Sequence, residues 1–440
     1  MNIVILVTHT FRSRYNELFS GLTKDDTITV VSLLNEKHFD SMSNKRKLFL
    51  FTQIRDFSET LRAKGIIVNE VFSTPSNIIG KLFLENSYDQ IRVERQFSYD
   101  ELQENRVIET LAKKCNVNYR EYTTQIFIDY KKYFSSIQEV PDTFTSFRKI
   151  VEKQNCYDVE LPQREIPQCS CVDLNMDLSQ EELGIEDEAL LFTPIEQNAF
   201  EHLHNYIWKF EYIKTYKQTR NQMIGSNFST RFSYLLNFGL LNVKEILHEI
   251  NSYETKKISN SSTYWVKFEL LWREYSKLIS LKYGKLLFLE KGIMNKDIYS
   301  NYNKEFYDTF VEGNTGYSLV DAGIRELKTT GFMSNRARQN VASFFVKNLH
   351  LPWLMGAEFF EKYLLDYDPA SNYLNWQYIA GCGTDSREFR YFNIAKQTKD
   401  YDPKHEFISY WVPEYKDSSY SKIVDFYESV DVAKKEQKLL

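Results

Sequence analysis

Two guanidinium groups and three side-chain amides stand close together in the stretch MSNRARQNVASFF, residues 333–345. They are Asn335, Arg336, Arg338, Gln339 and Asn340, and a run of small and aromatic residues follows them without proline or glycine. Asn335 and Arg338 are three residues apart, so they share one face of the predicted helix. Planar groups of this kind bind polar ligands through paired hydrogen bonds. The stretch therefore predicts a helix that begins at the mouth of a polar pocket.

A second polar group lies in LLDYDPASNYLNWQY, residues 364–378. Asp366 and Asp368 are acidic partners for Arg338, and a purely structural ion pair is the simple explanation for them. Removing one member of a buried pair costs about 3–5 kcal/mol, so such a pair is easier to understand when it also serves a ligand. Asn372 and Trp376 are four residues apart and share one helix face, one turn apart along the axis.

A carboxylate and an aromatic ring occur together in FELLWRE, where Glu269 precedes Trp272 and Arg273. A single tryptophan is more often packed in a core than set against a ligand. In FSTRFSYLL, the hydroxyl groups of Ser229, Thr230 and Ser233 stand at the start of an apolar helix. The free N–H groups at such a helix start suit a phosphate. The alternative is that one of these hydroxyl groups is a simple helix N-cap. Together these segments predict a pocket for a large, flat, phosphate-bearing cofactor.

The elements that must hold this pocket change character along the chain. Strand-like runs begin at Ile3, Thr27, Gly65, Gln90 and Val117. Between the second and third of them, Leu50, Ile54, Phe57 and Leu61 form one apolar helix face. A later helix opens with Ser98 and Glu101, the pattern of a capping box. Residues 1–130 are therefore expected to form a Rossmann-like α/β domain with a parallel sheet, but no glycine-rich turn follows the first strand to bind a dinucleotide.

Residues 131–194 are acidic and weakly periodic, and they predict an interdomain linker. Residues 195–440 predict an all-helical domain, with its clearest helical patterns at 194–221, 262–284, 318–331 and 336–349. The formal net charge is −5, which argues against a protein that coats nucleic acid through bulk positive charge and leaves room for a local basic patch.

The five cysteines show no CxxC pairs, so no metal site is expected. We expect them to be free thiols in a reducing compartment. The chain shows neither a signal-peptide pattern nor an apolar run long enough to span a membrane. We therefore expect an intracellular protein, in the cytoplasm or the nucleus, that is not secreted.

Three motifs carry a resemblance to a known family. TGYSLVDAGIRELKTTGFMSNRARQNVASFFVKNL, the segment from Leu364 to Pro403, and WVPE at 411–414 resemble the photolyase/cryptochrome family, and within it the DASH cryptochromes. TFTSFRKIVEK, from Thr143, is similar to the start of the linker in that group. The likeness is dense from about residue 205 to 414, and it is topological before that. It implies an N-terminal α/β domain followed by a helical domain that binds FAD.

The resemblance also implies which residues hold the cofactor. The pyrophosphate region would contact Tyr216, Ser229, Thr230, Arg231, Phe232, Ser233 and Arg273. Arg338 and Asp366 would form an ion pair beside the isoalloxazine ring, with Asp368 and Asn335 also at the cofactor. Asn372 would face flavin N5, where asparagine favours the fully reduced flavin.

For the substrate, the family positions that contact a flipped pyrimidine dimer fall on Glu269, Trp272, Asn335, Gln339, Tyr378 and Gln397, and Arg220 resembles a contact to the DNA backbone. The implied activity is that of a deoxyribodipyrimidine photo-lyase, a carbon–carbon lyase that reverses cyclobutane dimers, preferably in single-stranded UV-damaged DNA, as a monomer. The two histidines of (6-4) photolyases are absent. A blue-light photoreceptor and a flavin-containing nucleic-acid binding protein without repair remain alternatives.

Several positions depart from the family. The electron-relay tryptophans fall on Trp376 and Trp353, but the outermost position falls on Ser300, between Tyr299 and Tyr302. The first strand lacks the WFRxDLR motif, which leaves open whether an antenna chromophore, a folate or a deazaflavin, is bound. The four cysteines of the iron–sulfur relatives are also missing.

Overall fold

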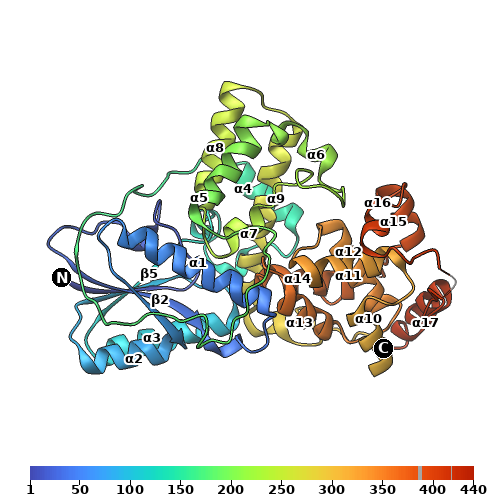
Figure 1. Ribbon diagram of the computed structural model, residues 1–440, viewed down its shortest axis with the longest axis horizontal. Helices are drawn as coiled ribbons and strands as arrows, with labels where there is room; N and C mark the ends of the chain where they lie inside the picture. Colours follow the sequence, from blue (N-terminus) through green and yellow to red (C-terminus); the bar gives the residue numbers. More distant parts are fainter. Residues whose placement is uncertain (385–388, 418) are drawn as a thin grey trace.

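The computed structural model describes residues 1–384, 389–417 and 419–440, and it consists of an α/β half and a helical half (Figure 1). The strands are β1 (Asn2–Val7), β2 (Thr27–Asn35), β3 (Val68–Ser73), β4 (Gln90–Glu94), β5 (Asn118–Tyr122) and β6 (Ser170–Cys171). The first five are parallel in the order β3-β2-β1-β4-β5, and β6 pairs with the start of β2. The helices of this half are α1 (Asn44–Arg62), α2 (Pro75–Glu85) and α3 (Tyr99–Lys114).

The central strand β1 is buried on both faces. Ile3, Ile5 and Val7 pack in one cluster with the predicted apolar face of α1, whereas Val4 and Leu6 pack in another with residues of α2 and α3. Alternate side chains of a strand point to opposite faces, so one apolar run serves two layers of helices. The predicted parallel α/β domain is confirmed.

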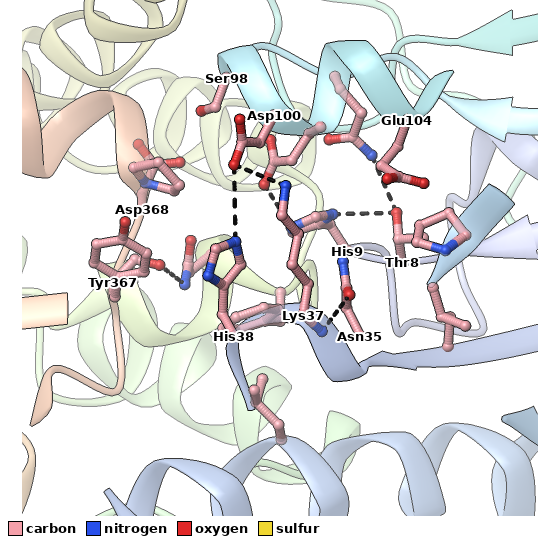
Figure 2. A pocket seen from close by; sticks show the side chains of 18 of the residues that line it. Thr8, His9, Asn35, Lys37, His38, Ser98, Asp100, Glu104, Tyr367 and Asp368 are labelled. Atoms are coloured by element: carbon pink, nitrogen blue, oxygen red, sulfur yellow. Dashed lines mark hydrogen bonds and ion pairs between the residues drawn. The ribbon is translucent and has the colours of Figure 1, made fainter. Parts of the chain in front are cut away.

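In the turn after β1, a side chain already occupies two backbone donors. The backbone N–H groups of Thr8 and His9 both donate to Oε1 of Glu94, at 3.0 Å each. A carboxylate therefore occupies the donors that a phosphate would need. The predicted capping box of α3 is wrong: Ser98 stands at the N-cap (Figure 2) but its side chain makes no capping bond, and Glu101 instead pairs with His9 Nε2 at 3.3 Å.

The predicted linker contributes to both halves. Its helix α4 (Phe144–Glu152) buries Phe144, Phe147 and Val151 in the largest core cluster, most of which lies in the helical half. Strand β6 then joins the sheet.

The helical half contains α5 (Glu196–His204), α6 (Tyr216–Thr219), α7 (Phe232–Asn237), α8 (Val243–Lys256), α9 (Ser261–Tyr283), α10 (Lys304–Glu312), α11 (Ser318–Thr330), α12 (Asn335–Lys347), α13 (Trp353–Tyr363), α14 (Pro369–Ala380), α15 (Ile394–Tyr401), α16 (Glu406–Trp411) and α17 (Phe426–Gln437). Residues 194–221 do not form the single helix predicted for them. Helix α5 ends in a π-helical turn, Asn205–Lys209, and the backbone then reverses at Glu211, whose φ is +53°. Trp208 explains part of this break, because its Nε1 donates to Glu249 Oε2 on α8 at 2.6 Å.

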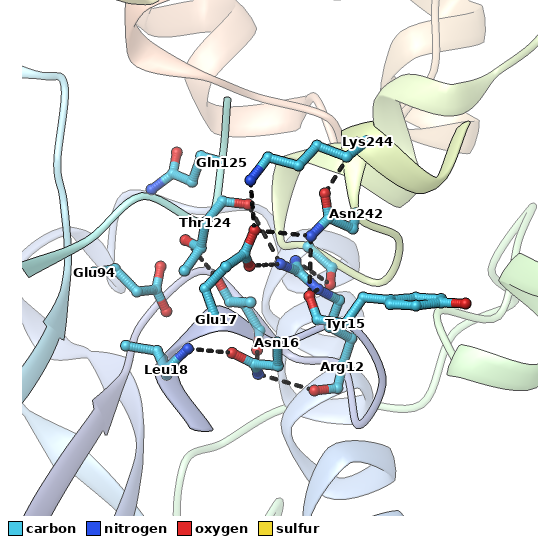
Figure 3. Close-up of polar contacts among 12 residues, drawn as sticks. Arg12, Tyr15, Asn16, Glu17, Leu18, Glu94, Thr124, Gln125, Asn242 and Lys244 are labelled. Carbon is cyan, nitrogen blue, oxygen red and sulfur yellow. Dashed lines mark hydrogen bonds and ion pairs between the residues drawn. The ribbon is translucent and has the colours of Figure 1, made fainter. Parts of the chain in front are cut away.

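A buried ionic cluster joins the two halves (Figure 3). Arg12 Nη2 lies 2.7 Å from Glu17 Oε2, and Lys244 Nζ at the start of α8 lies 3.3 Å from Glu17 Oε1. Asn242 Nδ2 also donates to Glu17 Oε1, at 3.0 Å. Loss of Glu17 would leave Arg12 buried without its charge partner, at a cost of about 3–5 kcal/mol. The cluster therefore fixes the helical half against the sheet.

Among the described residues, no helix is long and apolar enough to cross a membrane.

Candidate functional site

Helix α14 carries the predicted flavin-facing residues. Asp368 caps its N-terminus, where the carboxylate accepts a bond from the Ser371 N–H at 2.8 Å. Asn372, one turn further on, is buried, and its Nδ2 donates to the Ala357 carbonyl of α13 at 3.0 Å. This bond fixes the amide and leaves its carbonyl oxygen to accept a hydrogen bond from a ligand.

Arg338 and Asp366 form an ion pair. Arg338 Nη2 lies 3.0 Å from Oδ1 and 2.9 Å from Oδ2 of Asp366, while Arg338 Nε donates to the Met333 carbonyl at 2.8 Å. The carboxylate is nearly buried, with 3% of its side chain exposed, against 24% for the arginine. The guanidinium is thus held at the start of α12 with one edge toward solvent.

Asp368 has a cationic partner that the sequence reasoning missed. Lys277 Nζ on α9 lies 2.6 Å from Asp368 Oδ2 and 2.9 Å from Gln125 Oε1. Burial alone would raise the pKa of Asp368, but Lys277 and Arg273 lower it well below its usual range. The carboxylate is therefore ionised at neutral pH. Lys277 lies four residues after Arg273 on α9, a spacing that could have indicated it.

The segment 229–233 turns at Arg231, which contacts the loop after α11. Arg231 has a φ of +50° and its guanidinium lies 4.7 Å from the Phe332 ring, while Ser229 and Thr230 are partly buried and Ser233 is exposed. Phe232 and Tyr216 are buried in the neighbouring core cluster. Arg273, expected at the phosphates, donates to the carbonyls of Gln125 at 2.5 Å and Leu236 at 3.4 Å.

Polar atoms without partners surround Arg231 and Arg338. Arg231 Nε, the Tyr234 hydroxyl and Glu326 Oε2 are buried and have no hydrogen-bond partner in the part of the chain that is described. Burial raises the pKa of Glu326 to about 8, against the effect of both arginines. Buried polar groups are rarely left unpaired, so this set fits a pocket whose polar ligand supplies partners.

The second group of predicted residues brings rings and a carboxylate together around Glu269, and we name this cluster the mouth. Glu269 pairs with Arg220 and accepts a bond from Trp265 Nε1 at 3.1 Å. Burial raises the pKa of Glu269, and Arg220 opposes the shift. Trp272, one turn further along α9, is 36% exposed. The sequence reasoning missed Trp265, although it lies four residues before Glu269 on the same face.

The first turns of α12 complete this mouth. Arg336 donates to Gln339 Oε1 at 3.1 Å and to Asn221 Oδ1 at 3.2 Å, and it lies 4.3 Å from the Tyr401 ring. Asn335 is exposed. Arg336 belongs to the opening stretch that was expected at the pocket. Among the described residues it forms no ion pair with a carboxylate, unlike Arg338.

Two further predicted substrate residues, Tyr378 and Gln397, come from outside α12 and are hydrogen-bonded. Gln397 on α15 accepts a bond from Asn340 Nδ2 at 3.4 Å, and Arg390 donates to the Tyr378 hydroxyl. Asn340 thus links the opening stretch to Gln397.

The relay tryptophans are buried, each 2% exposed. Trp376 lies against α13 where Gly356 leaves room, because a Cβ there would stand 2.3 Å from the indole. The tyrosine ring beside Trp353 is Tyr373, with centroids 6.2 Å apart. Tyr299, next to the Ser300 position, packs instead near His350, at 5.3 Å.

A cavity of about 360 Å³ opens at the carboxyl edge of the sheet (Figure 2). Lys37 and His38 pair with Asp100 there, at 2.9 and 3.9 Å, and His9 pairs with Glu101. Burial alone would lower the pKa of His9, but Glu101 and Glu94 raise it above its usual value. Tyr373 lines the same cavity from the helical half. Ligands of parallel α/β sheets bind at this edge.

Both halves of the chain are similar to known proteins. A profile described as DNA photolyase matches residues 3–168, and one described as the FAD binding domain of DNA photolyase matches residues 265–439. A cryptochrome DASH of Gloeobacter violaceus is 39% identical over 385 residues, 86% of this chain and 77% of that protein. One of Xenopus laevis is 34% identical over 431 residues, 94% of this chain and 82% of that protein. The crystal structure of a Synechocystis sp. PCC6803 cryptochrome is 31% identical and has a TM-score of 0.92, covering 99% of this chain and 98% of that chain.

Proposed function

The chain belongs to the photolyase/cryptochrome family, with cryptochromes DASH among its relatives, and we propose that it is a light-dependent lyase that reverses cyclobutane pyrimidine dimers, preferentially in single-stranded DNA. Its helical half contains the FAD-binding domain of the family. The observation that carries the proposal is the mouth around Glu269, in which a paired carboxylate stands one turn from the partly exposed ring of Trp272.

This mouth suits a pair of bases that has left the stack. Flipping a damaged base costs a few kcal/mol, and least in a single strand. The face of Trp272 recovers about 1–3 kcal/mol per stacked base. Glu269 then accepts a hydrogen bond from the N–H edge of a pyrimidine, while Arg220 and Arg336 supply positive charge for the neighbouring phosphates. At the positions of the (6-4) histidines the chain has Asn335 and Gln339, which favours cyclobutane dimers as the substrate.

The residues that would hold the cofactor are those of α12 and α14. Arg338 would face the isoalloxazine ring with its charge fixed by Asp366, and Asp368 with Lys277 would anchor the other side. Asn372 would accept a hydrogen bond at the flavin without adding a negative charge there. When bound in its reduced form, FAD supplies the electron that opens the dimer after light absorption.

The cavity at the sheet edge is proposed for the antenna chromophore that the sequence left open. Its volume of about 360 Å³ lies in the range of small-molecule sites. Glu101 and Lys37 would fix a polar heterocycle, and Tyr373 would line its other side. Fluorescence of a folate or deazaflavin released from the purified protein tests this; a protein that releases neither and binds neither when they are added has no antenna here.

Repair of a thymine-dimer oligonucleotide tests the main proposal, with reduced flavin, in light and in the dark. We expect light-dependent repair that is faster on the single strand than on the duplex. Glu269→Gln should repair more slowly, whereas Glu305→Gln, an exposed change on α10, should not. No repair of either strand by FAD-loaded protein would favour the photoreceptor or the binding protein without repair.

A further inference from the structure

A second cleft, away from the mouth and the sheet edge, lies where α5 and α8 meet the loop after β1. It has a volume of about 420 Å³, and we name it the α8 cleft after its acidic wall, Glu245 and Glu249. Arg14 and Arg164 form a basic wall, and Phe200 and Trp208 line it from α5 and the π-helical turn. Neither the flavin residues nor the lesion mouth uses these side chains.

Glu245 is the informative residue of this cleft. It is only 8% exposed, yet within the described chain its carboxylate accepts no hydrogen bond and forms no ion pair, although it lines the cleft. Burial raises its pKa to about 7, with Arg14 and Arg12 acting in the opposite direction. The oxygens of Glu245 are not fully buried, so a ligand in the cleft that brings N–H groups can reach them.

The basic wall also has hydrogen-bond donors that lack strong partners. The Arg14 guanidinium lies over the Phe200 ring, and its nearest carboxylate oxygen, Glu196 Oε1, is 3.9 Å away. Arg14 Nη2 is buried and has no partner among the described residues, and the same holds for that oxygen of Glu196. Arg164 is 60% exposed and pairs only loosely, at 3.6 Å, with Glu165. Two guanidiniums with free donors suit an anionic oxygen group such as a phosphate.

The loop that carries Arg14 is held in a strained shape. Tyr15 has a φ of +49°, which is unfavourable for an aromatic residue. Its N–H donates to the Arg164 carbonyl at 3.0 Å, and its own carbonyl accepts bonds from Arg12 Nε at 3.1 Å and Asn242 Nδ2 at 2.9 Å. Figure 3 shows the Tyr15 side chain extending away from the Arg12–Glu17 cluster. Strain kept by several bonds is typical of functional sites.

We infer that the α8 cleft binds a guanine 5′-nucleotide. Guanine presents two adjacent N–H donors, N1 and N2, which match one carboxylate, Glu245, whereas adenine and cytosine present a donor beside an acceptor. The 5′-phosphate would pair with Arg14 and Arg164. Trp208, whose indole is held by Glu249, would offer a face for stacking. This inference concerns binding in the dark and is independent of repair.

Calorimetric titration of the FAD-loaded protein in the dark tests the inference, with GMP, AMP and guanosine as probes. We expect GMP to bind about tenfold or more tightly than AMP, since a well-formed pair of hydrogen bonds discriminates by at least that factor. Guanosine should bind more weakly than GMP because it lacks the phosphate. Equal affinity for AMP and GMP, or no heat with GMP, would overturn the inference.

Single-residue variants test whether GMP binds in the α8 cleft. Glu245→Gln should weaken GMP binding about tenfold or more, and Arg164→Ala should weaken the binding of GMP but not of guanosine. His248→Gln, an exposed change on the same helix, is the matched control, with flavin absorbance as the check on folding. If Lys37→Ala at the sheet edge abolishes GMP binding and Glu245→Gln does not, the nucleotide binds elsewhere and the assignment is wrong.

Discussion

Trp272 lies stacked on Phe144, with ring centroids 3.7 Å apart and planes 14° from parallel. Phe144 comes from α4 in the segment that links the two halves, so the linker supports one face of the indole and leaves the rest of it partly exposed. We expect Trp272→Ala to weaken binding of a single-stranded thymine-dimer oligonucleotide about tenfold to a hundredfold, because one stacking surface is lost.

Phe144→Ala should weaken the same binding less, since the indole remains but loses its support. Fluorescence anisotropy with labelled oligonucleotides measures both effects. Tyr410→Ala, an exposed aromatic change on α16, is the control. Equal affinity of Trp272→Ala and the parent protein would mean that the damaged bases bind elsewhere.

The Arg338–Asp366 pair gives a prediction about the cofactor. Asp366→Asn removes the charge that fixes Arg338 and should cost about 3 kcal/mol, the lower end of the range for a buried pair, because the arginine is partly exposed. We expect the purified variant to lose most of its flavin, as measured by absorbance. Asp308→Asn, an exposed change on α10, should retain it. Full flavin content in Asp366→Asn would show that the pair does not hold the cofactor.

Glu326 predicts a dependence of stability on pH. Its pKa of about 8 in the folded chain stands above the ordinary value of 4.5, so between these two values only the unfolded chain loses the proton. The carboxyl group therefore lowers the free energy of unfolding as pH rises from about 4.5, and this effect levels off above about 8.

Glu326→Gln should remove this loss, which is on the order of 5 kcal/mol at most. Thermal unfolding at pH 5 and pH 8 measures this effect. The melting temperature of the variant, relative to that of the parent, should be higher at pH 8 than at pH 5. Glu305→Gln should give no such difference. Melting curves that stay parallel across this range would mean that Glu326 is ionised in the folded protein.

The strands and the long helices were predictable because their burial follows one period. Strand β1 is apolar from Ile3 to Val7, and the apolar residues of α1 recur every three to four positions, so local pattern and packing agree. Glu101 was misassigned because a capping box is a local rule, and His9, ninety-two positions earlier, competes for the same carboxylate. The prediction of a single helix at 194–221 was wrong for a similar reason, because the hydrogen bond from Trp208 to Glu249 on α8 outweighed local helix propensity.

Some pairings in the candidate site could be predicted from the sequence, and others could not. Arg338 and Asp366 could be paired from their types because both stand in recognisable segments. Lys277 and Asp368 are 91 residues apart, so the spacing of Lys277 from Arg273 could mark Lys277 as a pocket residue but not as the partner of Asp368. The cleft between α5 and α8 could not be predicted either, because its walls come from four separate segments that only the fold brings together.

The electron relay gives the last prediction. Trp376 and Trp353 are buried on neighbouring helices, so Trp376→Phe should slow photoreduction of the flavin strongly in blue light with external reductant. Because Tyr373 is the tyrosine packed beside Trp353, Tyr373→Phe should also slow it, whereas Tyr302→Phe, an exposed change, should not. Ser300→Trp should hasten it by restoring the outer ring of the family. Flavin absorbance during illumination measures each rate. An unchanged rate in Trp376→Phe would remove that residue from the relay, and an unchanged rate in Tyr373→Phe alone would place the outer donor elsewhere.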